Sequence, residues 1–283
     1  MSSKLSINNH SVDIAGLKYI YPVISRRAGG LSIGVNFNTD NSCNWRCIYC
    51  QVPGLKVGVA PPIDLNLLES ELRYFLSQVI HGDFYQRYNV AQANREIKDI
   101  AIAGNGEPTT LKEFASAVTL IGEVAAELQI FPQSKYVLIT NGSLIHQPRV
   151  QEGLRQLHAF GGEVWFKLDS ATEEGKRFIN NAGQSRVASL DNLMISDRLC
   201  QTKLQICLFD YDNQGFSARE KTAFIQQLKT IKAVSSIVCV MLYTIARPSL
   251  QPESGKLKKM SAETMNAFAD EVKSLGFNVS ISL

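Results

Sequence analysis

The sequence predicts an α/β fold that is built on a parallel sheet. Short apolar segments alternate with longer amphipathic ones about six times, and a last apolar segment closes the chain. Strands that alternate with helices imply βαβ units, whose strands run parallel. Six units are too few for a full eight-unit barrel, so an open sheet or a partial barrel fits better. The 283 residues, 45% of them hydrophobic, are enough for one large core.

Seven segments have the length and composition of buried strands. They are LSIGVNFN (31–38), IKDIAIAG (97–104), KYVLIT (135–140), EVWFKLD (163–169), KLQICLFD (203–210), SSIVCVMLY (235–243) and NVSISL (278–283). In the segments between these strands, apolar residues recur at helical spacing. Asp64 is a plausible N-cap for the first helix. The expected helices span 64–80, 111–128, 148–160, 189–200, 218–231 and 262–276.

No Pro-rich or Ser-rich linker divides the chain. We therefore expect a single domain over 1–283, with an N-terminal extension at 1–30 and a partial barrel at 31–283. The region 82–96 lacks a clear period and is expected to be an irregular insertion. The segment 247–259 is the most loop-like part of the chain, and its KLKK run is expected to be solvated.

Composition restricts the functional class. The formal net charge of +3 neither requires nor excludes a polyanionic partner. The N-terminal residues lack the apolar core of a secretory signal, and the longest apolar runs are strand-sized. A cytoplasmic protein without a membrane segment is expected. Six cysteines in such a chain favour metal binding or catalysis over disulfides.

Three cysteines follow the first predicted strand in the segment CNWRCIYC: Cys43, Cys47 and Cys50. Thiolates suit zinc or iron–sulfur clusters, and both kinds of site prefer four protein ligands. No fourth cysteine or histidine lies nearby in sequence. Three ligands suggest an iron left open for an exogenous ligand. The alternatives are three cysteines that only pack, or a zinc site completed by a distant cysteine, for which Cys200, Cys207 and Cys239 are the candidates.

A second motif, GNGEPTTL (104–111), follows the second predicted strand. Gly104 and Gly106 allow the backbone to approach a ligand closely, and the carboxylate of Glu107 lies beside them. An ordinary strand-to-helix turn is the simpler interpretation of this motif alone. The carboxyl ends of parallel strands are the place where ligands bind in such folds, which favours a functional role.

The two motifs together resemble those of the radical S-adenosylmethionine (radical SAM) superfamily. The resemblance covers nearly the whole chain, because the strand–helix order is similar to that family's partial (βα)6 TIM-like barrel of parallel strands. SRRAGGLSIGVNF, GNGEPTTL, ITNGSLI and FKLDSAT further resemble the branch of the wybutosine-synthesis tRNA enzymes.

The resemblance implies a role for each matching residue. Cys43, Cys47 and Cys50 would ligate three irons of one 4Fe–4S cluster, and S-adenosylmethionine would chelate the fourth. Six further residues are expected to contact S-adenosylmethionine. Tyr49 would lie against the adenine, Gly106 and Glu107 would receive the methionine ammonium, and Asn141, Asp169 and Ser170 would bind the ribose and the rest of the cofactor.

The resemblance also implies the reaction. The cluster would reductively cleave S-adenosylmethionine to methionine and a 5′-deoxyadenosyl radical, which abstracts hydrogen from a substrate. A reductant such as flavodoxin or ferredoxin would supply the electron. The protein would orient the reactants and exclude water and oxygen.

Several polar residues are expected inside the barrel or at its mouth. Period two in 163–169 places Trp165, Lys167 and Asp169 on one face, toward the lumen. Buried charges there must be paired or bind something. Gln205 and Arg247 are polar candidates on later strands. Arg26 and Arg27 are candidates for contact with an anionic substrate.

The chain departs from the wybutosine branch because no cysteine precedes Cys43 to bind a second cluster. One cluster is therefore expected, and the substrate stays open between an RNA base, a small molecule and a protein. Two alternatives remain. One is an activase that generates a glycyl radical on a partner protein, and the other is a non-catalytic iron–sulfur or zinc protein.

Overall fold

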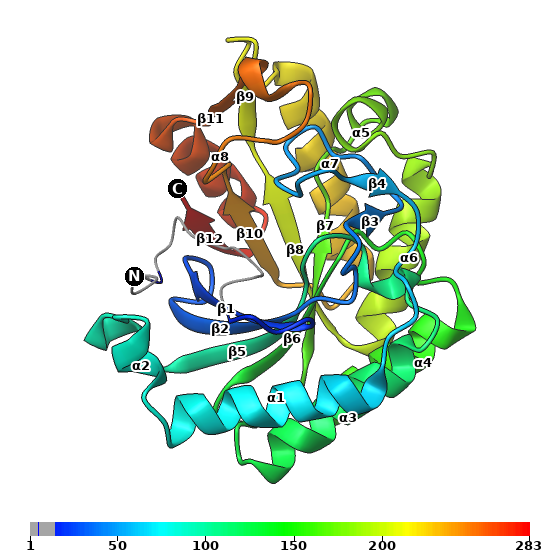
Figure 1. Cartoon of the computed structure of the whole chain (residues 1–283). Helices are drawn as coiled ribbons and strands as arrows, with labels where there is room; N and C mark the ends of the chain where they lie inside the picture. Colours follow the sequence, from blue (N-terminus) through cyan, green and yellow to red (C-terminus); the bar gives the residue numbers. More distant parts are fainter. Residues whose placement is uncertain (1–4, 6–14) are drawn as a thin grey trace.

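The computed structural model describes Leu5 and residues 15–283 and contains one sheet of eight strands in the order β1-β2-β5-β6-β7-β8-β10-β12. The strands are β1 (Ile20–Ser25), β2 (Gly30–Val35), β5 (Ile97–Ile102), β6 (Lys135–Thr140), β7 (Glu163–Lys167), β8 (Gln201–Cys207), β10 (Cys239–Tyr243) and β12 (Asn278–Ser282). Seven of them run parallel, and only β1 pairs antiparallel, with β2. The sheet curls into the half-barrel that Figure 1 shows, so the predicted partial barrel of parallel strands is confirmed.

Six main helices follow the parallel strands and cover the outer face of the sheet (Figure 1). They are α1 (Leu65–Ile80), α3 (Phe114–Glu127), α4 (Pro148–Ala159), α6 (Arg186–Leu199), α7 (Ala218–Val234) and α8 (Ala262–Ser274). Each corresponds to a predicted helix. Asp64 caps α1 as expected, because its Oδ1 accepts a hydrogen bond of 3.1 Å from the Leu67 amide.

The two faces of the strands differ as their period-two pattern predicts. Val164 and Phe166 of β7, with Leu168 just beyond it, belong to the large apolar core between sheet and helices. Trp165 belongs to a separate small cluster on the concave face, together with Ala101 and Val137. The outer face of the sheet therefore packs against the helices, whereas the inner, concave face is available to bind a ligand.

Several elements were not predicted. They are β1, helix α5 (Glu173–Asn180), the pair β3 (Ser42–Cys43) and β4 (Lys56–Val57), and the pair β9 (Phe209–Tyr211) and β11 (Leu257–Lys259). β1 lies within the predicted extension 1–30, whose residues 1–4 and 6–14 fall outside the described part. β11 includes part of the KLKK run, and Lys258 and Lys259 are exposed as expected.

The remaining segments are short. The region 82–96 contains α2 (Phe84–Arg87) and a 3-10 turn, η1 (Gln92–Asn94). Two further 3-10 turns, η2 (Pro108–Thr110) and η3 (Ser254–Lys256), lie in loops at the carboxyl ends of strands. Among the helices that the structure describes, none is both long enough and apolar enough to cross a membrane.

Candidate active site

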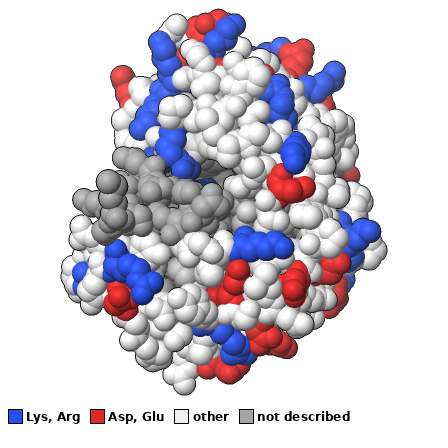
Figure 2. Space-filling model, viewed as in Figure 1, with Lys and Arg blue, Asp and Glu red and all other residues white. Residues whose placement is uncertain are grey.

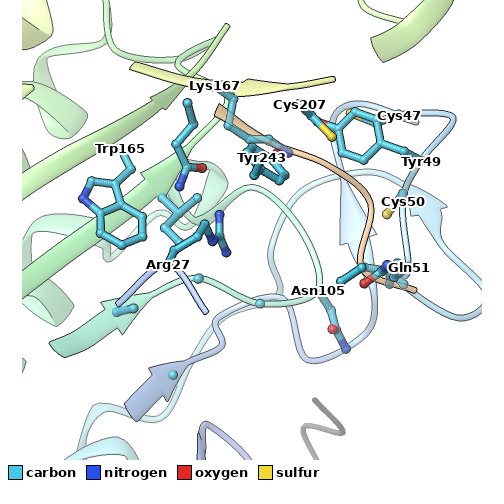
Figure 3. A pocket seen from close by; sticks show the side chains of 18 of the residues that line it. Arg27, Cys47, Tyr49, Cys50, Gln51, Asn105, Trp165, Lys167, Cys207 and Tyr243 are labelled. Atoms are coloured by element: carbon cyan, nitrogen blue, oxygen red, sulfur yellow. The ribbon is translucent and has the colours of Figure 1, made fainter. Parts of the chain in front are cut away.

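A cavity of about 360 Å³ opens at the carboxyl ends of the strands and extends into the half-barrel (Figure 3). Its upper wall is the loop of the three cysteines, together with the loops that follow β5, β6 and β10. Its lower part is lined by side chains of the strands and by the turn between β1 and β2. Ligand pockets in proteins commonly begin at about this size.

The cysteine loop is fastened to parts of the chain that are distant in sequence. Arg46 forms a two-pronged ion pair with Glu253, with N–O distances of 2.9 and 2.8 Å. The Ile48 amide donates to the Ile179 carbonyl at 2.8 Å, next to the end of α5. Ser249 donates to the Ile48 carbonyl at 2.7 Å. These contacts hold the loop over the barrel mouth.

All three cysteines line the cavity. Burial raises the pKa of the Cys43 thiol to about 12 and that of Cys47 to about 11. The Cys47 Sγ accepts a hydrogen bond of 3.2 Å from the Asn180 amide. A bound metal centre would lower these pKa values, because thiols bind metals as thiolates.

The described residues contain no group of three or more His, Cys, Asp or Glu side chains placed to hold one metal ion. Cys200 and Cys239 do not line the cavity, whereas Cys207 does. Three thiols of one loop around this hollow fit a cluster whose irons are bound separately. A closed zinc site needs four ligands around one ion, and the described residues do not place even three of these side chains in that way.

The loop after β5 presses directly against the cysteine loop. A Cβ on Gly106 would lie 2.0 Å from the Ser42 carbonyl oxygen, so only glycine fits at this position. Gly104 has a φ of 143°, which side chains rarely adopt. The two predicted motifs are therefore packed together, and Gly106 and Glu107 both line the cavity.

Glu107 is buried, and its carboxylate is bound by neighbours. Oε1 accepts from the Thr109 hydroxyl at 2.6 Å and from the Thr140 hydroxyl at 2.5 Å, and Oε2 accepts from the Asn141 amide at 2.6 Å. Burial raises the pKa of this carboxyl group, and the hydrogen bonds oppose that rise. Oε2 has acceptor capacity left for one more donor, such as an ammonium.

Asn141 lies at the end of β6 and lines the same cavity. Its Nδ2 donates to Asn44 Oδ1 at 2.9 Å, and its Oδ1 accepts from the Ser143 amide at 3.0 Å. Asn141 thus connects the cysteine loop with the Glu107 loop. Its side chain is fixed, as a residue that positions a ligand must be.

Tyr49, between Cys47 and Cys50 on the cysteine loop, and Asp169 form one hydrogen-bonded unit. The Tyr49 hydroxyl donates to Asp169 Oδ2, which also accepts from Asn180 Nδ2 at 2.9 Å. Asp169 Oδ1 is buried without a hydrogen-bond partner among the described residues. Lys167 Nζ lies 4.9 Å from the centre of the Tyr49 ring.

Ser170 lies next to Asp169 but has a different environment. Its hydroxyl donates to Glu220 Oε1 at 2.7 Å, and Glu220 also accepts from the Ala171 amide and the Thr172 hydroxyl. Ser170 does not line the large cavity. In this structure it fastens the loop before α5 to the start of α7, and its expected contact with a cofactor stays a prediction.

The cavity also contains side chains that the sequence indicated only as candidates or did not indicate at all. Arg26, Arg27, Lys167, Gln205 and Arg247 were candidates, and all five line the cavity. Cys207, a candidate partner for a zinc site, also lines it, and so do four residues that the sequence did not indicate: Tyr21, Ser32, Asp99 and Tyr243. Cys207 and Tyr243 lie inside apolar runs, where no local pattern separates a lumen residue from a core residue.

Comparisons with known sequences found relatives of low identity. A scan found no matching family model. A UPF0026 protein of Helicobacter pylori strain 26695 is 28% identical over 246 residues, which are 86% of this chain and 70% of that protein. Another, from strain J99, is 29% identical over 150 residues, and the match covers 53% of this chain and 41% of that protein. The chain therefore spans less than half of the latter relative.

Solved structures resemble the whole half-barrel. TYW1 with a lysine-pyruvate adduct bound has a TM-score of 0.56 at 15% identity, over 87% of this chain and 74% of that one. A radical SAM methyltransferase from Sphaerobacter thermophilus has a TM-score of 0.55 at 12% identity, over 89% and 66%. A structure of anSMEcpe with bound AdoMet has a TM-score of 0.51 at 17% identity, over 79% of this chain and 55% of that one. The chain has the fold of radical SAM enzymes.

Proposed function

We propose that the protein is a radical SAM enzyme with one 4Fe–4S cluster. One observation carries this proposal: the three cysteines and the Gly106–Glu107 loop line the same cavity, at the carboxyl ends of the strands of this fold. The thiols supply soft ligands for iron, and the incomplete ligand set leaves one coordination position for S-adenosylmethionine. A purely structural metal site does not need a buried, fixed carboxylate such as that of Glu107 beside it.

Each residue of the upper cavity has a place in this proposal. Cys43, Cys47 and Cys50 hold the cluster. Gly106 and Glu107 receive the methionine ammonium through the remaining acceptor capacity of the loop and of Oε2.

The other four predicted contacts divide into two groups. Tyr49 and Asn141 line the cavity and contact the rest of the cofactor. Asp169 positions Tyr49 through the phenol hydrogen bond, and Ser170 holds the loop before α5. Contact of Asp169 and Ser170 with the ribose side of the cofactor stays a prediction.

When bound, the cluster and S-adenosylmethionine supply one-electron cleavage of the sulfonium to methionine and a 5′-deoxyadenosyl radical, which takes hydrogen from the substrate. This chain's residues bind and orient these groups and exclude water from them. We propose a small reduced carrier such as flavodoxin or ferredoxin as electron donor, so that the activity is that of an oxidoreductase. The cysteines of the described chain form no disulfides, which suits a reducing compartment such as the cytoplasm.

The cleavage reaction tests the proposal directly. The protein is purified anaerobically, reconstituted with iron and sulfide, reduced with dithionite and given S-adenosylmethionine. We expect 5′-deoxyadenosine and methionine by mass spectrometry, and we expect both to disappear in Cys47→Ala. The matched control is Cys239→Ala, which removes a thiol of β10 that does not line the cavity. Bound zinc without iron uptake, or equal loss in both variants, would contradict the proposal.

A further inference from the structure

A small pocket of about 10 Å³ lies outside the large cavity, and it is lined by Trp45 of the cysteine loop, by the end of β7 and by residues of α5, α6 and α7. Trp45 and Lys167 line both spaces, so the small pocket and the large cavity are adjacent. Exposed cations and anions are interspersed over the described part of the face in Figure 2, so surface charge there does not indicate a ligand of one sign. The buried polar groups of the small pocket are the more informative feature.

Gln227 of α7 indicates that the small pocket has an occupant. Its side chain is buried and lines the pocket, and neither Oε1 nor Nε2 has a hydrogen-bond partner among the described residues. A buried amide without partners destabilises a folded protein, and native proteins rarely keep one. The amide offers both donors and an acceptor, so a polar occupant would satisfy it.

Asp169 contributes a second unpartnered group to the same pocket. Its Oδ2 accepts from the Tyr49 hydroxyl and from Asn180 Nδ2, but its Oδ1 is buried and accepts from no described residue. Hydrogen bonds to a charged acceptor are stronger than those to a neutral one, so a carboxylate oxygen without a donor is costly. Oδ1 therefore needs a donor from an occupant of the pocket.

Lys176 of α5 brings a buried cation to the pocket. Its Nζ donates to Gln184 Oε1 at 3.2 Å and to the Ser185 carbonyl at 3.5 Å. An ammonium has three donors, so these two acceptors leave one N–H for an occupant. Burial lowers the pKa of Lys176 to about 8, and the charges of Glu173 and Asp169 oppose that lowering, so the ammonium is mostly protonated at neutral pH.

These groups favour water over an ion as the occupant. The pocket's volume of about 10 Å³ is close to what one water molecule needs, and a buried water usually bonds two to four polar groups. Asp169 would repel an anion, and Lys176 would repel a cation. Water is neutral, and it can donate to the carboxylate while it accepts from the ammonium.

We propose that one buried water molecule binds to Asp169 Oδ1, the Gln227 amide and Lys176 Nζ. This water fixes the Asp169 carboxylate, whose other oxygen accepts from Tyr49. Lys176 and Gln227 are then positioning residues, which act on the large cavity through Asp169. The water site itself is independent of the function proposed above, and only its effect on the cofactor through Tyr49 rests on that function.

A crystal structure of the whole chain, at a resolution that shows ordered waters, tests the occupant directly. We expect one water within hydrogen-bond distance of Asp169 Oδ1, the Gln227 amide and Lys176 Nζ. Crystals soaked in rubidium bromide distinguish water from ions, because both ions give an anomalous signal. An empty pocket, or a rubidium or bromide peak inside it, would overturn the proposal.

Gln227→Leu provides a test in solution, because the two possibilities shift the melting temperature in opposite directions. If the amide has no partner, leucine removes an unsatisfied group and the variant melts higher than the wild type, which would contradict the proposal. If a water bonds the amide, leucine removes that bond and loosens the water that Asp169 needs, so the variant should melt a few degrees lower. Gln226→Leu is the matched control, because Gln226 is the exposed neighbour on the same helix.

A double-mutant cycle with Lys176→Met shows whether one water connects two side chains. Lys176 and Gln227, which both lie in the described part of the chain, share no direct hydrogen bond. If both bond the same water, the second substitution should lower the melting temperature clearly less once the first is in place. Fully additive losses would show that no water is shared.

Binding of S-adenosylmethionine to the reconstituted protein, measured by isothermal titration calorimetry, tests the effect on the cofactor. Gln227→Leu should weaken it about threefold to tenfold at unchanged iron content, whereas Gln226→Leu should not. Equal binding in the two variants would refute the link through Tyr49. If the water is found but no 5′-deoxyadenosine forms, the radical function fails and the water site stands. If 5′-deoxyadenosine forms but the pocket is empty, the water site fails and the radical function stands.

Discussion

Asp99 is an acidic side chain that is buried inside the half-barrel, where a charged group is costly. It is 2% exposed, it lines the cavity, and its carboxylate accepts a hydrogen bond from the Ser32 hydroxyl. Burial raises its pKa to about 6, against the lowering effects of Ser32 and of Arg27. An ordinary aspartate has a pKa of about 3.9, so the folded state holds this proton more tightly than the unfolded state.

This shift fixes the sign of a pH effect on stability. The folded pKa lies above the unfolded one, so the stability that the protonated group contributes is lost as the pH rises from about 4 through about 6. Asp99→Asn removes the charge and keeps an acceptor for Ser32. We expect it to raise the free energy of unfolding at pH 8 by about 1 to 3 kcal/mol, and by much less at pH 4.5.

Urea unfolding of both proteins at the two pH values measures this difference. Asp191→Asn, at an exposed position of α6, is the control for the loss of one carboxylate. An equal gain from Asp99→Asn at both pH values would show that removal of the charge is not the cause.

At the residue scale, the spacing of residues within a motif predicted the members of the site better than the closeness of two residues in sequence did. Cys43, Cys47, Cys50 and Glu107 were selected by motif, and the structure brings them to one cavity. The sequence predicts similar roles for the neighbours Asp169 and Ser170, yet Asp169 accepts a hydrogen bond from Tyr49 and Ser170 donates one to Glu220. The strand ends at Lys167, and beyond it the alternation that separates lumen from core no longer applies.

At the scale of elements, the site depends on close contact between two loops rather than on one strand. The Gly106 backbone lies against the Ser42 carbonyl, and Asn38 Nδ2 donates to that same carbonyl at 2.8 Å. The cysteine loop therefore has its position set by the loop that carries Glu107. A small change at this contact should disturb both loops together.

Gly106→Ala tests this coupling. Its Cβ would lie 2.0 Å from a backbone oxygen, which cannot move as a flexible side chain can. We expect a loss of about 1 to 3 kcal/mol of stability, as for other overpacked sites, and a reduced iron content after reconstitution. Gly183→Ala is the matched control, because no atom lies within 4 Å of its Cβ and its φ is ordinary. Equal iron content and equal melting temperature in the two variants would show that the loops are not coupled.

Long periodic elements were predictable, and short or edge elements were not. The six main helices and seven parallel strands follow from periodicity, with ends shifted by a few residues. β1 was missed because Pro22 interrupts its pattern, and such strands lie at sheet edges, as this one does. Because Tyr21 and Ser25 of β1 line the cavity, the sequence did not predict this part of the cavity wall. The eight-residue α5 was missed because it is short and mostly polar.

At the scale of the whole molecule, one apolar core extends from β1 to α8, and the candidate site joins two segments that are far apart in sequence, the cysteine loop and the loop after β10. Arg46 pairs with Glu253, and the Leu250 amide donates to the Cys50 carbonyl at 2.9 Å. Sequence alone could not give these contacts, because about 200 residues separate their partners. Ligands bound in this cavity should therefore stabilise the molecule as a unit and not one half of it.

Calorimetry tests this prediction on the reconstituted protein. A ligand at 100 times its Kd adds about 2.7 kcal/mol to the stability of the state that binds it. For a chain of this size, S-adenosylmethionine should then raise Tm by about 5 °C within a single transition. Cys47→Ala should lose most of this shift, because the proposed cluster supplies part of the cofactor's contacts, whereas Cys239→Ala should keep it. Two separate transitions, of which only one responds to S-adenosylmethionine, would mean that the cavity does not couple the cysteine loop to the loop after β10.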